Sequence, residues 1–178
     1  IFDVVMREKT RVRMEIETSL RQALDRHEIS LHYQPLVILD GGKLCGFEAL
    51  LRWNHPTRGN IEPDQFVPIA EETGLIYPLG RWVLQTACAQ MQDWRARLPD
   101  AAGLHMNVNV SARQLSQAEF AQEVLDVLAE TGLPNDGLQL EITETALIEE
   151  SDIVSDNLNH LEAAGILIHL DDFGTGYS

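Results

Sequence analysis

The chain has 178 residues, with 13 Lys plus Arg against 28 Asp plus Glu and a formal net charge of −15 at pH 7. Hydrophobic residues make up 44% of it, which excludes a chain that is disordered for lack of apolar residues. This acidity argues against a nucleic-acid polymer as partner, because phosphate backbones require a basic surface. The acidity does not exclude a phosphate-bearing ligand that is held through metal ions.

Cys45 and Cys88 fit neither a disulfide framework nor a metal spacing, so we expect a reducing, cytoplasmic compartment. No apolar run reaches the roughly 18 residues that span a bilayer, so we expect no membrane contact within this segment.

Residues 1–29 are predicted to form one helix. Ile16, Leu20 and Leu24 recur every four residues, and charged residues fill most of the other positions. The pattern fits a connector helix that leads into a domain covering residues 30–178. An ordinary first helix of that domain explains it equally well, and both interpretations stay open.

The first half of the remaining chain predicts a hairpin followed by helices. Two strand-like segments flank the turn at 40–42, which reads Asp-Gly-Gly. A loop with two prolines and a glycine follows at 54–63. The predicted elements of this half are strands over 31–39 and 44–53 and helices over 64–73 and 79–98.

From residue 105 onward, strands and helices alternate, which is typical of βαβ units and a parallel sheet. The predicted strands span 105–111, 138–143 and 166–171, and the predicted helices span 116–130 and 151–164. The first of these helices is expected to open with a capping box from Ser116 to Glu119. The strands repeat every 30 to 32 residues, close to the roughly 31 per unit of a (β/α)8 barrel. Five strands are too few for a closed barrel, so either the chain stops early or the sheet is open.

The last three predicted strands each carry one polar face. In 138–143, for example, the leucines and the isoleucine alternate with Gln139, Glu141 and Thr143. Parallel strands buried on both faces are nearly continuously apolar, so the apolar faces here must meet the helices. The other faces gather Asn109, Glu141 and Asp171 at the carboxyl ends of the strands, where α/β folds place their sites.

Acids that share one buried face repel one another, so a cation is expected among them. The candidate ligands offer only oxygen atoms, which favours Mg²⁺ or Mn²⁺ over Zn²⁺. Two neighbouring ions suit phosphoryl-ester hydrolysis, and the adjacent acids at 171 and 172 could serve both. The candidates are Glu48, Asn109, Glu141, Asp171 and Asp172.

Several motifs, in order, resemble the EAL domains, a family of cyclic di-GMP phosphodiesterases. The resemblance covers the chain after about residue 12, and it is specific because it extends over many motifs. They are Tyr33-Gln-Pro35, Glu48-Ala-Leu50 within 47–53, His55-Pro56 with Arg58-Gly59, 66–71 (Phe-Val-Pro-Ile-Ala-Glu) leading to Gly74-Leu-Ile76, 109–114 (Asn-Val-Ser-Ala-Arg-Gln), Glu141-Ile-Thr-Glu144, and 171–178 (Asp-Asp-Phe-Gly-Thr-Gly-Tyr-Ser).

The resemblance implies a fold, a reaction and residue roles. The fold is α/β, a modified (β/α)8 TIM-like barrel of EAL type in which one early strand is antiparallel, and only about its first five strands are present here. The reaction is the hydrolysis of cyclic di-GMP to linear pGpG with two Mg²⁺ or Mn²⁺ ions. The implied metal ligands are Glu48, Asn109, Glu141, Asp171 and Asp172, of which Glu48, Asp171 and Asp172 are catalytic; Gln34 and Arg52 contact substrate, and Glu144 anchors the loop after Asp172.

The family pattern continues past residue 178 into a Lys-Ile-Asp strand, a further metal-binding Glu and a Gln-Gly motif. The resemblance therefore implies that residues 30–178 are the N-terminal two-thirds of an EAL-type domain, incomplete for catalysis by themselves. It also implies an upstream sensory or diguanylate-cyclase-type domain, and homodimerisation. A non-catalytic cyclic di-GMP receptor of the same fold is the main alternative, and an unrelated open-sheet binding protein is the remote one.

Overall fold

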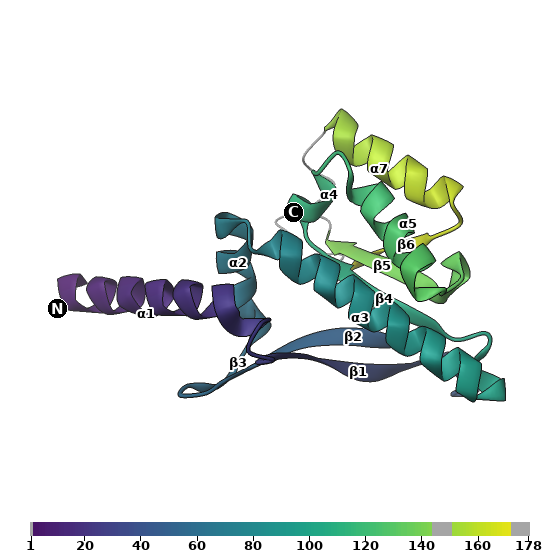
Figure 1. Cartoon of the computed structure of the whole chain (residues 1–178), viewed down its shortest axis with the longest axis horizontal. Coiled ribbons are helices and arrows are strands. Elements are labelled where there is room, and N and C mark those ends of the chain that lie inside the picture. Colours follow the sequence, from purple (N-terminus) through teal and green to yellow (C-terminus); the bar gives the residue numbers. More distant parts are fainter. Residues whose placement is uncertain (1, 144–150, 172–178) are drawn as a thin grey trace. The chain divides into compact units, whose positions relative to one another are not determined.

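A computed structural model describes residues 2–143 and 151–171, with side chains for 11–98, 100–143 and 151–170. Its helices are α1 (Phe2–Ala23), α2 (Pro63–Thr73), α3 (Ile76–Arg97), α4 (Ala112–Leu115), α5 (Phe120–Thr131) and α7 (Asp152–Ala163) (Figure 1). Its strands are β1 (Ile29–Val37), β2 (Leu44–His55), β3 (Gly59–Ile61), β4 (His105–Val110), β5 (Leu138–Thr143) and β6 (Leu167–Asp171). Short 3-10 turns, η1 (Pro99–Ala101) and η2 (Asn135–Gly137), precede β4 and β5.

The strands form one sheet in the order β1-β2-β4-β5-β6, with β3 paired to β2. Strand β2 runs parallel to β4, β4 to β5 and β5 to β6, whereas β2 and β3 are antiparallel. A turn in which the Ile38 N–H donates to the Lys43 carbonyl at 2.8 Å joins β1 to β2 as a hairpin. The predicted α/β class, the hairpin start and the parallel βα pattern are confirmed.

The described chain divides into two compact units. The first comprises residues 1–30 and 51–79, and the second comprises 31–50 and 80–178. The predicted division into a connector helix over 1–29 and a domain over 30–178 is not tested by this partition and stays a prediction.

The first unit has a small aromatic core. Trp53 and Phe66 are fully buried, and their rings meet edge to face with centroids 5.4 Å apart. The Trp53 indole N–H donates to Glu28 Oε2 at 3.1 Å, so the buried ring keeps a partner for its one polar atom. Helix α1 contributes Ile16 and Leu20 to this core and contacts α2, which explains the four-residue spacing of its apolar positions.

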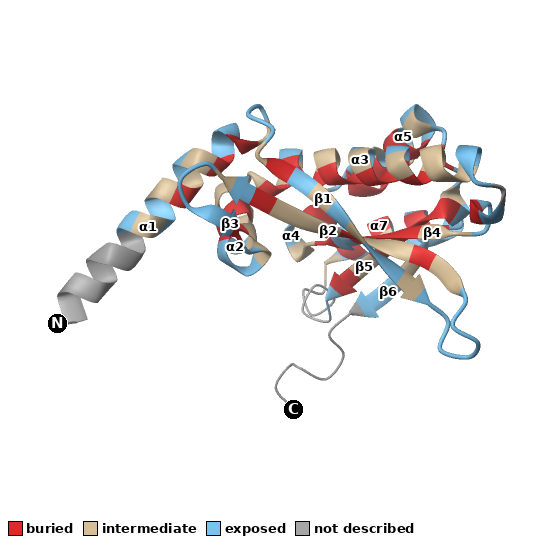
Figure 2. Cartoon of the chain, turned by 90° about the horizontal axis from the view of Figure 1, so that it is seen from below, coloured by how far each residue is buried: buried red, intermediate tan, exposed pale blue. Residues whose placement is uncertain are grey.

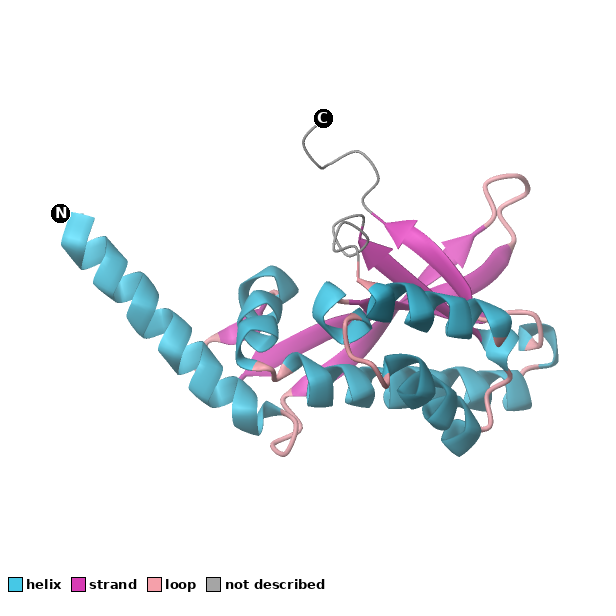
Figure 3. Cartoon of the chain, turned by 90° about the horizontal axis from the view of Figure 1, so that it is seen from above, coloured by secondary structure: helices cyan, strands magenta, loops and turns pink. Residues whose placement is uncertain are grey.

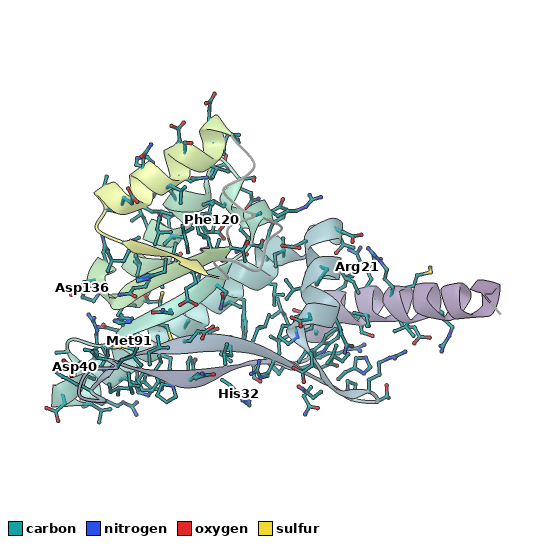
Figure 4. The ribbon with its side chains drawn as sticks, turned by 180° about the vertical axis from the view of Figure 1, so that it is seen from behind. Arg21, His32, Asp40, Met91, Phe120 and Asp136 are labelled. Carbon is teal, nitrogen blue, oxygen red and sulfur yellow. The ribbon has the colours of Figure 1, made fainter. Side chains whose placement is uncertain are left out.

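The second unit is a helix-covered parallel sheet. On β4 and β5, the apolar positions of the alternating pattern are at most 4% exposed and face the helices. In Figure 3 the helices of this unit lie on one side of its strands, and α5 contacts α7. Met91 of α3 and Phe120 of α5, both labelled in Figure 4, are fully buried in this layer. Strand β6 is more exposed than β5 (Figure 2), and it leaves Leu167 and Leu170 accessible.

Asn157 ties α7 to the turn between α4 and α5. Its side chain is 3% exposed and makes three hydrogen bonds. Nδ2 donates to the carbonyls of Leu115 and Gln117 at 2.8 and 2.7 Å, and Oδ1 accepts from the Ala121 N–H at 3.1 Å. These bonds satisfy every polar atom of a buried amide, and they join segments about 40 residues apart in the chain.

Three local predictions are wrong. Residues 59–61 form β3 inside the predicted loop, because Gly59 takes a positive φ of 70° that turns the chain back and Ile61 pairs with Trp53 in the core. Helix α1 ends at Ala23, where Glu28 N–H bonds the Ala23 carbonyl, and does not extend to residue 29. The capping box lies five residues earlier than predicted, at the start of α4.

That capping box is formed by Ser111 and Gln114 at the start of α4. The Gln114 N–H donates to Ser111 Oγ, and Gln114 Oε1 accepts from the Ser111 N–H, both at 3.3 Å. Ser116, the predicted cap, instead donates its hydroxyl to the Ala112 carbonyl at 2.9 Å. Glu119, its predicted partner, occupies the N-cap of α5 without a side-chain bond.

In the described part of the chain, no helix is long and apolar enough to cross a bilayer.

Candidate functional site

Three adjacent parallel strands bring predicted oxygen ligands of the second unit to one face of the sheet. Glu48 of β2 pairs with Asn107 of β4, and one step further along, Asn109 of β4 pairs with Glu141 of β5. Side chains two residues apart on a strand share a face. Glu48, Asn107, Asn109 and Glu141 therefore project from the same side of the sheet, opposite the helix-covered apolar side.

Two asparagine amides of β4 hold the two carboxylates. Asn109 Nδ2 donates to Glu48 Oε1 at 2.9 Å, and Asn107 Nδ2 donates to Glu141 Oε1 at 2.6 Å. Both bonds run diagonally to a neighbouring strand, one on each side of β4. N–H donation to a carboxylate is among the stronger hydrogen bonds in proteins, so the amides fix the positions of both acids.

The two bonds differ in depth. Asn109 is exposed and Glu48 is half-buried, whereas Asn107 is only 6% exposed. Within the described part of the chain, Asn107 Oδ1 is buried and has no hydrogen-bond partner. The site thus has an accessible edge at Asn109 and a floor at Asn107 that carries one unsatisfied acceptor.

The structure supports the predicted meeting of Glu48, Asn109 and Glu141. Asn109 contacts Glu48 directly and lies beside Glu141 in the strand register, so the three are not scattered. Thr143 pairs with Asp171, which places the backbone of Asp171 beside the end of β5. The side chain of Asp171, and all of Asp172 and Glu144, lie outside the described residues, so their predicted roles stay predictions.

The two predicted substrate contacts fall in different units. The rings of Tyr33 and Phe47 both contact Trp94 of α3, the first edge to face and the second tilted, with centroids 5.1 and 4.6 Å from that of Trp94. Their neighbours Gln34 and Glu48 therefore project from the opposite face. Gln34 is exposed on that face. Arg52 belongs to the first unit, where it is half-buried and donates from Nη1 to the Leu51 carbonyl at 2.8 Å.

The oxygen atoms of these side chains are suitable ligands for a hard divalent cation. The carboxylates of Glu48 and Glu141 and the amide oxygen of Asn109 lie on one face of the sheet, and no sulfur or imidazole ligand is required. The side chains that the structure describes include no cluster of three or more His, Cys, Asp or Glu. The described group has two acids and an amide, and the acids predicted to complete it are Asp171 and Asp172.

His105 lies on the same face of β4, two residues before Asn107. Partial burial lowers the pKa of His105 below its ordinary value, and the positive charges of His169 and Arg95 lower it further. Its ring lies over Gly46, its register partner on β2, where an added Cβ would come within 2.7 Å of ring atoms and 2.5 Å of the His105 carbonyl oxygen. A neutral imidazole therefore closes the amino end of this face.

Asn107 is the site residue that the sequence prediction omits. The alternation of β4 already placed it on the polar face, one step below Asn109. Nothing in the sequence shows that its amide reaches Glu141, because that contact depends on the offset between β4 and β5.

Comparison with known proteins gives a consistent result. Residues 17–178 match the family described as the EAL domain. The chain is 46% identical over 173 residues to an uncharacterized signaling protein of Caulobacter vibrioides, covering 97% of this chain and 21% of that protein. It is 42% identical over 177 residues to the bifunctional diguanylate cyclase/cyclic di-GMP phosphodiesterase MucR of Pseudomonas aeruginosa, covering 99% of this chain and 26% of MucR.

Solved structures agree. The MucR phosphodiesterase in complex with c-di-GMP superposes with a TM-score of 0.86 at 44% identity, covering 92% of this chain and 66% of that one. The EAL enzyme Bd1971, bound to cAMP and cyclic-di-GMP, gives a TM-score of 0.85 at 32% identity, covering 95% of this chain and 46% of that one. The chain thus spans about a fifth to a quarter of these two curated relatives and no more than two-thirds of these two solved chains.

Proposed function

Because the chain belongs to the EAL domain family, we propose that it forms the metal-binding part of a site that hydrolyses cyclic di-GMP to linear pGpG. The observation that carries the proposal is the joint placement of Glu48, Asn109 and Glu141 on one sheet face, with Glu48 and Asn109 in direct contact. The resemblance to MucR, whose phosphodiesterase was solved with c-di-GMP, supports the choice of substrate.

Mg²⁺ or Mn²⁺ would be held by Glu48, Asn109, Glu141, Asp171 and Asp172. A bound ion of this kind supplies Lewis acidity toward the phosphodiester and lowers the pKa of water. The chain's own contribution is orientation, because the carboxylates of Glu48 and Glu141 each have one oxygen that accepts a hydrogen bond from an asparagine amide of β4. Such anchoring reduces the reorganisation needed when ion and substrate bind.

Gln34 and Arg52 are proposed to contact the substrate, and Glu144 to anchor the loop after Asp172. A cyclic dinucleotide carries two phosphates, so a cationic side chain such as Arg52 offers a bidentate partner. The proposed setting is a reducing, cytoplasmic one, in a protein with a sensory or diguanylate-cyclase-type domain and the ability to form a homodimer.

The test measures binding and turnover separately. Cyclic di-GMP is titrated calorimetrically in the presence of Ca²⁺, and its conversion to pGpG with Mg²⁺ or Mn²⁺ is followed by chromatography. Both assays are run on the 178 residues and on any longer protein in which they occur. Metal-dependent formation of pGpG supports the proposal. Binding without turnover in either form would favour the alternative, a receptor of the same fold, and the absence of both would overturn the proposal.

A further inference from the structure

Asn107 combines a strong hydrogen bond with an unsatisfied atom. Its Nδ2 donates to Glu141 Oε1 at 2.6 Å, which fixes the orientation of the amide, since the opposite orientation would set two oxygens against each other. Oδ1 must then point away from Glu141. It is buried, and no described residue donates to it.

Packing alone does not account for this arrangement. A side chain that is 6% exposed and keeps one bare acceptor is costlier to bury than an apolar side chain of the same size. Leucine has the same branched heavy-atom skeleton as asparagine and would cover the same floor without this penalty. Of the buried amides, Asn157 shows the other outcome, because both of its polar atoms are satisfied.

We infer that Asn107 is a positioning residue for the divalent-cation site: its N–H holds Glu141 Oε1, and its buried Oδ1 accepts a hydrogen bond from water that enters with the ion. This inference rests on the proposed function. Partners that orient ligand carboxylates typically change metal affinity by 10- to 100-fold when they are removed. A buried water requires polar partners, and this face supplies Asn107 Oδ1 below the two carboxylates.

The test uses Mn²⁺ alone as the probe, with its free signal in electron paramagnetic resonance giving the dissociation constant. Asn107→Leu should weaken Mn²⁺ binding about 10- to 100-fold and change the spectrum of bound Mn²⁺, while the melting temperature without metal is kept or raised. Gln139→Leu is the matched control: Gln139 is the register partner of Asn107 on β5 and is 9% exposed. It should leave Mn²⁺ affinity within about twofold.

A double-mutant cycle tests whether Asn107 acts through Glu141. Glu141→Asp keeps the charge but shortens the side chain by one methylene, so the carboxylate no longer reaches the Asn107 amide. In that background Asn107→Leu should weaken Mn²⁺ binding by a smaller factor than it does beside Glu141, because the contact between Asn107 and the carboxylate is already lost and only the water contact of Oδ1 remains to be removed. If circular dichroism shows that Asn107→Leu does not fold, Asn107→Ser carries the same expectations.

The outcomes separate the two proposals. If the unmodified protein binds no Mn²⁺, the proposed metal site is wrong and this inference falls with it. If the unmodified protein binds Mn²⁺ and Asn107→Leu binds it equally well, the metal site stands and only the role of Asn107 is overturned. Equal losses from Asn107→Leu in both backgrounds would also overturn it.

Discussion

The side-chain amide of Asn109 donates to Glu48 Oε1 across the β2–β4 pair at 2.9 Å. The register partner of Glu48 is Asn107, so this bond runs diagonally toward the carboxyl end of β4. The acid of the Glu-Ala-Leu motif is thereby directed toward the end of the sheet where Glu141 also lies. The contribution of the Glu48 charge can be tested with an uncharged side chain of the same size.

Glu48→Gln should reduce metal-dependent hydrolysis of cyclic di-GMP by more than about 100-fold, because it removes a charged ligand from the site. The fold should persist, with the free energy of unfolding within about 1 kcal/mol, because the half-buried side chain keeps its size and loses a charge beside other acids. Chromatography of pGpG and a urea unfolding curve provide the two measurements. Glu119→Gln, an exposed acid without a cap bond, is the control, and undiminished turnover in Glu48→Gln would remove Glu48 from the site.

Metal removal should both stop turnover and lower stability. EDTA is expected to abolish pGpG formation, and excess Mg²⁺ or Mn²⁺ to restore it. Mn²⁺ at 100 times its dissociation constant should stabilise the native state by about 2.7 kcal/mol, seen as a rise in melting temperature. Glu141→Gln should lose most of that rise. Hydrolysis that continues in EDTA would contradict the assignment of a metal-dependent site.

Asn157→Ala should destabilise the second unit by about 2–4 kcal/mol, since it removes three hydrogen bonds and leaves two backbone carbonyls and an N–H without their partner. Asn159→Ala on the exposed side of α7 is the matched control and should cost less than about 0.5 kcal/mol. Denaturant unfolding measures both. Equal effects would mean that α7 is not held through the Asn157 amide.

His105 should make stability depend on pH. Burial and the neighbouring charges of His169 and Arg95 lower the pKa of His105 in the folded state below the ordinary value of 6.5. The unfolded chain therefore takes up a proton first as pH falls, so this contribution to stability is complete above about pH 6.5 and decreases below it. Proton NMR of the imidazole should give the lowered pKa, and His105→Gln should flatten this part of the stability profile. A titration at or above 6.5 would show that the ring is not held neutral.

The fold follows from the sequence where periodicity and packing agree. The alternation in 105–111 and 138–143 predicted buried faces that the structure shows at Val108 and Leu140. The prediction misses strand β3 because a segment of three residues that begins with a glycine is too short to show periodicity. These residues form a strand only through their pairing with β2. The capping box was misplaced because Ser-x-x-Glu at 116–119 and Ser-x-x-Gln at 111–114 offer similar patterns, and only the packed helix selects between them.

The candidate site could be predicted in composition but not in connectivity. Glu48, Asn109 and Glu141 follow from polar positions near strand ends, together with the family motifs. The pairing of each acid with a particular amide depends on the stagger between strands, which leaves no trace in a single sequence. The contact between the Asn107 amide and Glu141 therefore follows only from the register of β4 and β5.

Strand β4 contributes both to the apolar core of the second unit and to the face that carries the proposed metal site. Asn107 and Asn109 alternate with Met106, Val108 and Val110, which fill the helix-facing layer. A slip of one residue would put valines against the carboxylates and asparagines among the helices, so every misregistered pairing is penalised on both faces at once. Burying the core and presenting the amides are thus one folding event, and a protein that has packed this strand correctly has already assembled the acid-holding half of its site.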